Sequence, residues 1–178
     1  LYGQAIKQKA IAELEKNYPS SILDDGSITN TLAWLWARTI VCNNPACGIK
    51  TPLLKSFWLS KKPNRPRWIK PIVLNSQVKF EIMTSGSPNI DGTISRTGAK
   101  CVGCGSLITL NEIKEAGKQG NLGQQMTVVV AEGVRQRVYL EPTSVHIDAA
   151  NVSINNEIPE LELSTHPQYM GTPRYGLT

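Results

Sequence analysis

Acidic residues are missing from a long internal part of this sequence. Residues 26–80 contain nine Lys or Arg and no Asp or Glu, although the chain of 178 residues has 14 acidic residues in all. The formal net charge is +5, so the positive charge is concentrated in this segment and the rest of the chain is acidic. A basic segment favours a polyanionic partner such as nucleic acid, and a solvated charged surface is the alternative.

Long apolar runs and familiar catalytic motifs are also missing. The longest apolar run, residues 32–41, is interrupted by Arg38 and is too short to cross a bilayer. The sequence has no glycine-rich nucleotide loop, Walker loop, nucleophile elbow, His-Glu-x-x-His helix or Asp-Pro-Pro-Tyr motif. We expect both histidines, His146 and His166, to be solvated or on a helix face. These absences argue against secretion, membrane insertion and an autonomous active site, and we expect a cytoplasmic protein.

The two ends of the sequence do not resemble natural termini. The chain begins at Leu1 rather than at a methionine, and it ends on an apolar stretch, residues 175–178. We therefore expect this sequence to be a segment of a longer protein.

The four cysteines form two closely spaced pairs. Cys42 and Cys47 are followed directly by Gly48, and Cys101 and Cys104 are followed directly by Gly105. Such a turn brings two sulfurs together, and the glycine permits the positive φ angle that lets backbone N–H groups face them. Two turns of this kind complete a tetrahedral Cys₄ site, so the pattern predicts one structural zinc ion. Two disulfides or four unrelated core cysteines are the alternatives.

A closed Cys₄ site excludes catalysis by its metal. All four coordination positions are filled by protein sulfurs, so the zinc ion could neither activate water nor polarise a substrate. The expected role of the zinc ion is to stabilise the fold. We expect the long segment between the two cysteine pairs to be an insertion whose ends return to the same place.

Periodicity and turn signals predict an α+β fold with helices before and after a β-rich centre. An i, i+4 stripe predicts an amphipathic N-terminal helix, and a second short helix is expected through residues 34–36. Strands are expected at residues 52–59, 68–74 and 78–83, the last two joined by a hairpin turn at Asn75 and Ser76, after a polar loop at residues 61–66. Further along, we expect a capped helix at residues 109–117, a hairpin of residues 127–131 and 137–140, and a short helix at residues 142–150.

This pattern divides the chain into four expected parts. They are a helical lead-in, a zinc-ribbon-like antiparallel region with inserted strands, a helix, hairpin and short helix packed on that region, and an extended tail. Their boundaries are residues 1–41, 42–108, 109–150 and 151–178.

Several blocks of the sequence resemble one family, the adenine-specific DNA methylases that contain a zinc ribbon. The matching blocks are residues 34–42, 47–48, 51–53, 56–62, 101–105, 129–133, 138–140 and 175–178. The resemblance implies that the chain is the cysteine-bearing insertion between a part that binds S-adenosylmethionine and a part that carries the Asp-Pro-Pro-Tyr motif. The catalytic and cofactor residues of the family then have no counterpart here, and S-adenosylmethionine is expected for the parent enzyme only. Only Cys42, Cys47, Cys101 and Cys104 carry over, as zinc ligands.

Two functions fit these observations. In the first, the basic segment contacts DNA, because cations neutralise phosphates and aromatic rings stack on exposed bases. The candidate residues are Lys55, Trp58, Lys61, Lys62, Arg65, Arg67, Trp68 and Lys70. In the second, the segment is a structural or protein-interaction module that packs on the flanking methyltransferase parts, with its tryptophans in the core and its lysines solvated.

Overall fold

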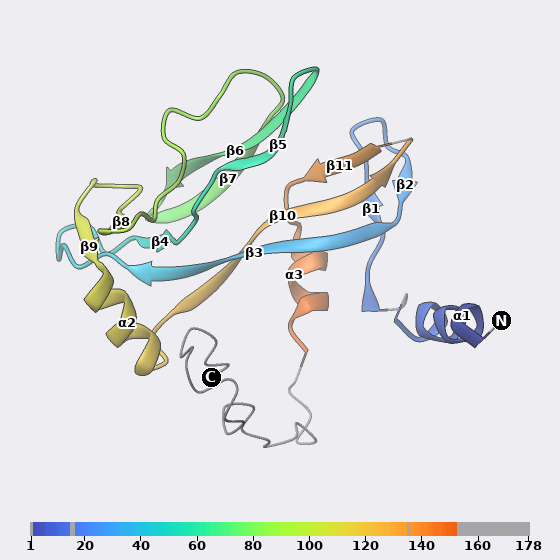
Figure 1. Cartoon of the computed structure of the whole chain (residues 1–178), viewed down its shortest axis with the longest axis horizontal. Coiled ribbons are helices and arrows are strands. Elements are labelled where there is room, and N and C mark those ends of the chain that lie inside the picture. The colour runs from blue at the N-terminus through green and yellow to red at the C-terminus, as the bar shows by residue number, and fades with distance from the viewer. Residues whose placement is uncertain (1, 15–16, 135, 153–178) are drawn as a thin grey trace, which may run out of the picture.

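Two long antiparallel strands, β3 (Thr31–Val41) and β10 (Gly123–Gly133), form the centre of the structure (Figure 1). This computed structural model describes residues 2–14, 17–134 and 136–152. The central sheet has the order β11-β10-β3-β4, with β11 (Gln136–Leu140) and β4 (Lys50–Pro52) at its edges. Consecutive residues of β10 from Met126 to Ala131 are buried, so this strand is covered on both faces. Antiparallel sheets with separate helices confirm the predicted α+β class.

The predicted second short helix is wrong, because residues 34–36 lie within β3. Trp34 pairs with Val129 of β10, and Trp36 pairs with Met126. Upstream of β3, the short strands β1 (Ser21–Ile22) and β2 (Ile28–Thr29) form a small sheet of their own. Aromatic and β-branched residues suit a pleated, half-buried surface, and pairing with a distant strand decided the conformation here.

A separate three-stranded sheet lies between the two cysteine pairs in sequence. It consists of β5 (Trp58–Lys62), β6 (Arg65–Leu74) and β7 (Gln77–Met83), in that order. The single strand expected at residues 52–59 is in fact two strands, β4 and β5, and the expected loop at residues 61–66 is only a tight turn. The hairpin turn at Asn75 and Ser76 is confirmed, with φ angles of 49° and 61°. Two consecutive positive φ angles are typical of a type I′ turn.

The ends of this inserted segment return to the same place, as expected. Thr93 lies on the returning chain, and its Oγ1 donates to Pro52 O at 2.5 Å and accepts from Leu54 N at 2.8 Å. The chain then forms β8 (Gly98–Lys100) and β9 (Leu107–Thr109), which pair around the second cysteine turn. The end of the insertion is therefore hydrogen-bonded to the end of β4, where the insertion begins.

The remaining predicted elements are confirmed. The helix α2 (Leu110–Lys118) begins with a capping box between Thr109 and Glu112. Strands β10 and β11 form the expected hairpin, and α3 (Ser144–Ala150) is the expected short helix. Of the extended tail expected from residue 151, residues 153–178 lie outside the described part of the chain.

The N-terminal helix α1 (Tyr2–Leu14) is confirmed but has no buried residue, and Figure 1 shows it apart from the sheets. Just after it, the Tyr18 ring stacks on Trp34 with centroids 4.9 Å apart. Among the described residues, no helix is both long enough and apolar enough to cross a membrane.

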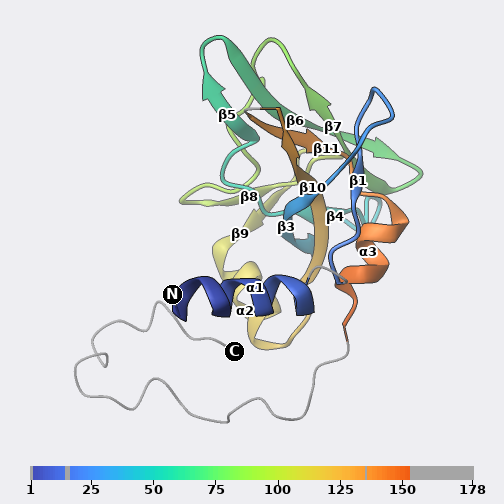
Figure 2. The ribbon, with the colours of Figure 1, turned by 90° about the vertical axis from the view of Figure 1, so that its right-hand side faces the viewer.

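The main core joins the inserted sheet to the central sheet. Phe57, Ile69, Val78 and Phe80 from the insertion pack with Val128 of β10. Figure 2 shows the β5–β6–β7 sheet beside β10 and β11, which agrees with this packing. The same cluster contains Cys42 and Cys101, so the cysteine turns are part of the core.

The helix α3 contacts strand β1 of the small two-stranded sheet through His146. The ring is buried rather than solvated, with Nε2 3.3 Å from Ser21 Oγ and Nδ1 2.8 Å from Thr143 Oγ1. Burial lowers the pKa of His146 below its ordinary value of 6.5. The neutral form of the ring is therefore the one that fits the folded protein.

Acidification should weaken the fold through His146. Below about pH 6.5 an unfolded chain takes up a proton on this histidine, whereas the folded chain stays unprotonated down to its own lower pKa. The free energy of unfolding should therefore fall as the pH decreases from about 6.5 to the pKa of the folded state. Above about pH 7.5 the group is neutral in both states and contributes no pH dependence. Urea denaturation between about pH 7.5 and 5.5 measures this effect. His146→Gln, which keeps polar groups but cannot titrate, should flatten the profile, and an unchanged profile in this variant would contradict the assignment.

Candidate metal centre and nucleic-acid interface

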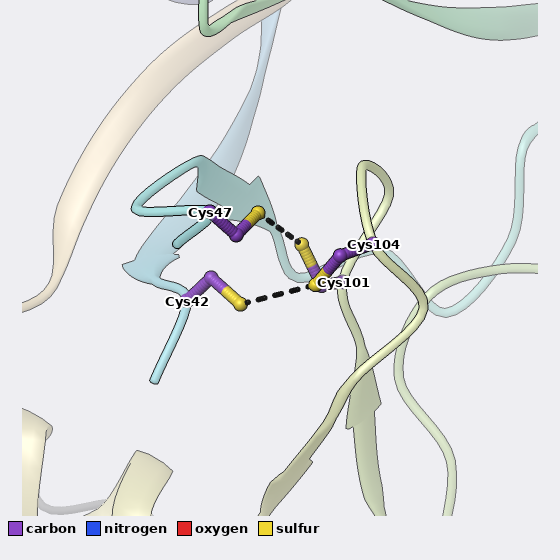
Figure 3. Close-up of side chains that lie close together, drawn as sticks. All are labelled: Cys42, Cys47, Cys101 and Cys104. Carbon is purple, nitrogen blue, oxygen red and sulfur yellow. Dashed lines mark hydrogen bonds between the residues drawn. The ribbon is translucent and has the colours of Figure 1, made fainter. Parts of the chain in front are cut away.

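Two similar turns bring the four cysteines together (Figure 3). Cys42 and Cys47 lie on the turn between β3 and β4, and Cys101 and Cys104 lie on the turn between β8 and β9. Each turn is closed by the same kind of bond: Cys42 N–H donates to Ile49 O, and Cys101 N–H donates to Ser106 O, both at 2.9 Å. The two halves of the site are therefore closed by the same kind of backbone bond, although the first turn is two residues longer.

The glycine after each pair has the backbone conformation that the sequence predicts. Gly48 has a φ angle of 61° and Gly105 a φ angle of 75°. A residue with a Cβ atom rarely adopts these angles. The positive φ angle turns the chain back toward β4 in one case and β9 in the other.

The distances between the sulfurs fit the tetrahedral coordination of one metal ion. Cys42 Sγ and Cys104 Sγ are 3.6 Å apart, Cys47 Sγ and Cys101 Sγ are 3.7 Å apart, and all four sulfurs lie within 4.8 Å of one another. A tetrahedron with metal–sulfur bonds of about 2.3 Å has edges of about 3.8 Å. The four cysteines could therefore hold a metal ion such as zinc.

The distances do not fit disulfides. A disulfide requires two sulfurs at about 2.05 Å. All four cysteines are free thiols in the structure, and their sulfurs converge as a group of four rather than as two bonded pairs. A metal shell explains this convergence, whereas four unrelated core cysteines do not.

The surroundings of the four thiols differ, and they shift the pKa values of these thiols in different directions. Burial raises the pKa of Cys42 to about 12, whereas the Ser106 hydroxyl, 3.1 Å from Cys104 Sγ, lowers the pKa of Cys104 to about 6. Cys101 is buried and accepts hydrogen bonds from Thr51 Oγ1 at 3.2 Å and from Gly103 N at 3.4 Å. A bound cation favours the thiolate form of every ligand, so metal binding releases protons from the more buried thiols.

The site is closed by protein on its inner side. A Cβ atom on Gly103 would clash with the Ile49 side chain, so the second turn lies directly on the first. No histidine or carboxylate joins the four-cysteine cluster among the described residues. The arrangement has no open ligand position and can stabilise the fold without supporting metal catalysis.

The basic segment is divided between two faces of the inserted sheet. Lys62 pairs with Arg65 across the hairpin, and these two side chains, with Arg67, line a groove beside β11. Side chains alternate between the two faces of a strand, so the residues next in sequence to these three lie on the opposite face of the sheet. That face carries Trp58, Lys61, Trp68 and Lys70, with Lys61 Nζ 5.8 Å from the Trp58 ring. Lys55 is exposed on the loop before β5.

The predicted stacking role of Trp68 does not fit its position. The side chain is only 9% exposed, and its Nε1 donates to Ser85 O at 2.9 Å. A ring held under the chain in this way is not available to a base, so Trp68 belongs to the core. Trp58 is half-buried and keeps part of its ring accessible.

Sequence reasoning missed one basic residue that faces the same groove. Arg137 of β11 lines the groove opposite Lys62, Arg65 and Arg67. It belongs to the hairpin that the sequence predicted, but nothing in the local pattern places that hairpin beside the inserted sheet. Only the packing of the core brings the two together.

Comparisons of the chain with protein-family models, with curated proteins and with solved structures found no match. The resemblance to zinc-ribbon DNA methylases therefore remains a prediction from the sequence motifs.

Metal binding should link the two cysteine turns and the insertion between them. The purified chain is expected to bind one metal ion, and Cys101→Ser should lose the ion because three thiolates leave the shell incomplete. Hydrogen exchange should then accelerate over residues 42–105 but not in α3. Metal analysis and exchange measured by mass spectrometry check both effects.

Ser106→Ala is a matched control for this experiment. It removes a hydrogen bond to Cys104 but no ligand, so it should keep one metal ion per chain. Unaltered metal content in Cys101→Ser, or disulfides in the purified chain, would contradict the site.

Proposed function

We propose that this chain is a zinc-stabilised, non-catalytic accessory segment that contacts DNA within an S-adenosylmethionine-dependent, adenine-specific DNA methyltransferase. The observation that supports it most directly is the pair of matching cysteine turns, whose sulfurs converge beside a basic sheet. The parent enzyme is inferred from the resemblance of the sequence motifs alone.

Zinc is the metal that suits this ligand set best. Four thiolates are soft ligands, and tetrahedral coordination by sulfur is typical of zinc and of iron–sulfur sites. The paired turns followed by glycine are the usual surroundings of a structural zinc ion. The closed shell gives such an ion a stabilising role, in keeping with the absence of catalytic motifs in the sequence.

Unpaired cations support contact with DNA. Arg65 Nη1 donates to Gln136 Oε1 at 2.6 Å, and Arg67 Nη1 donates to the carbonyl oxygens of Pro66 and Thr84 at 2.8 and 3.3 Å. Among the described residues, the salt bridge that forms is between Lys118 and Glu115 on α2. Neither arginine is therefore neutralised by a carboxylate there, and both keep donors for phosphate oxygens.

DNA binding by the metal-loaded chain should be weak and sensitive to salt. With about four phosphates contacted, the logarithm of affinity should fall against the logarithm of salt concentration with a slope of about −3 to −4. Changing Arg65 and Arg67 together to Ala should reduce the magnitude of this slope by up to about 2. Fluorescence anisotropy with a labelled oligonucleotide, repeated over a salt series, measures both slopes. Absence of binding at low salt would refute contact with DNA.

The chain should not bind S-adenosylmethionine. It lacks the glycine loop that would hold the cofactor and the Asp-Pro-Pro-Tyr motif that would hold adenine. Calorimetry with the metal-loaded chain is expected to give no heat of binding, and an assay with labelled cofactor to give no methyl transfer. Stoichiometric cofactor binding to this chain alone would show that it is more than an accessory segment.

A specific observation favours the second candidate, a module that packs on the flanking methyltransferase parts. Apolar side chains are exposed on α1 and β3, including Tyr2 at 88%, Ile6 at 68% and Trp36 at 41%. The buried Trp34 Nε1 has no hydrogen-bond partner among the described residues. An unpaired buried donor costs about 1–3 kcal/mol, and because this atom is buried within the chain, an acceptor on a partner reaches it only if the residues around Trp34 move. A zinc-loaded chain that binds no DNA would leave this candidate as the explanation.

A further inference from the structure

A groove of about 1490 Å³ lies between the inserted sheet and β11. One wall comes from β5 and β6 and the other from β11, which face each other in Figure 1. The walls touch at two points: Arg65 Nη1 donates to Gln136 Oε1 at 2.6 Å, and Tyr139 OH donates to Leu59 O at 3.4 Å. The two walls of the groove are therefore in direct contact at these two points.

Positive charge outweighs negative charge in this groove. Lys62, Arg65 and Arg67 line it from one side and Arg137 from the other, against the carboxylates of Asp24 and Glu141. None of these six groups forms an ion pair within the described part of the chain. Unneutralised charges of one sign in a concave site concentrate the field and attract a polyanion.

We propose that this groove is the binding site for a single strand of nucleic acid, with Arg137 as a phosphate contact from β11. This inference rests on the proposed function and specifies where and in which form the DNA binds. The volume exceeds the roughly 300–1,000 Å³ of pockets that hold a small molecule, which favours an extended chain.

The lining of the groove suits bases as well as phosphates. Leu59 and Ile82 add apolar surface beside the cations, and Tyr139 is half-buried, with its ring against the main core and its OH bonded to Leu59 O. A basic groove with aromatic and apolar side chains is the usual means of binding single strands without regard to sequence. A duplex would have to lie across the rims, because the walls approach to hydrogen-bonding distance.

The test compares variants that each change one charge. Binding of a labelled oligothymidine to the full, metal-loaded chain is measured by fluorescence anisotropy over a salt series. Arg137→Ala should weaken binding and reduce the magnitude of the salt slope by about 0.7–1. Glu141→Gln should tighten binding, since it removes a negative charge from the groove. Lys79→Ala removes an exposed charge from β7 on the face of the sheet away from the groove and should leave the slope unchanged.

The outcomes separate this inference from the proposed function. Wild-type affinity and salt slope in Arg137→Ala, with binding of the wild-type chain intact, would overturn the groove as the binding site but not contact with DNA. Duplex DNA that binds more tightly than the single strand, with the same dependence on Arg137, would overturn the single-strand assignment. A wild-type chain that binds neither form at low salt would refute both. Metal content and circular dichroism equal to the wild type confirm that each variant is folded.

Discussion

The convergence of four thiols on one point is the constraint on which the rest of this structure depends. It fixes the turn between β3 and β4 against the turn between β8 and β9, although these turns are separated by the whole inserted sheet. Thr93 adds a second anchor where the insertion returns to β4. With both ends held, the hydrophobic residues of the insertion pack on Val128 of β10, so the insertion shares a core with the central sheet. The cysteine cluster therefore sets the position of a sheet.

The position of that sheet creates the surface to which we assign a function. Because the inserted sheet lies beside β11, its basic face and Arg137 of the opposite wall border the same groove. The same hairpin carries its other lysines on the far face, where Lys61 lies near Trp58. A basic run in a sequence is thus divided by the alternation of side chains along a strand. The DNA contact that we propose depends on the half that faces β11.

The local features of this protein could be predicted from its sequence, and the features set by long-range packing could not. The cysteine turns with Gly48 and Gly105, the hairpin at Asn75 and Ser76 and the capped helix after Thr109 each depend on a few neighbouring residues. The local pattern around Trp34 and Trp36 predicts a helix and contains no sign of their strand partners on β10, which lie far away in sequence. The burial of Trp68 beside Ser85 and the position of Arg137 at the groove likewise depend on contacts between residues that are not neighbours in sequence. Local patterns predicted that the four cysteines would come together, whereas only the folded chain separates exposed cations from core residues.

X-ray absorption at the zinc edge, on the purified chain, tests the metal centre most directly. The sulfur positions predict a single shell of four sulfur neighbours at about 2.3 Å with no nitrogen or oxygen ligand. Such a spectrum would show that all four cysteines bind one ion at once. A shell that contains nitrogen or oxygen, or a chain without zinc, would contradict the claim that these thiolates hold the fold together.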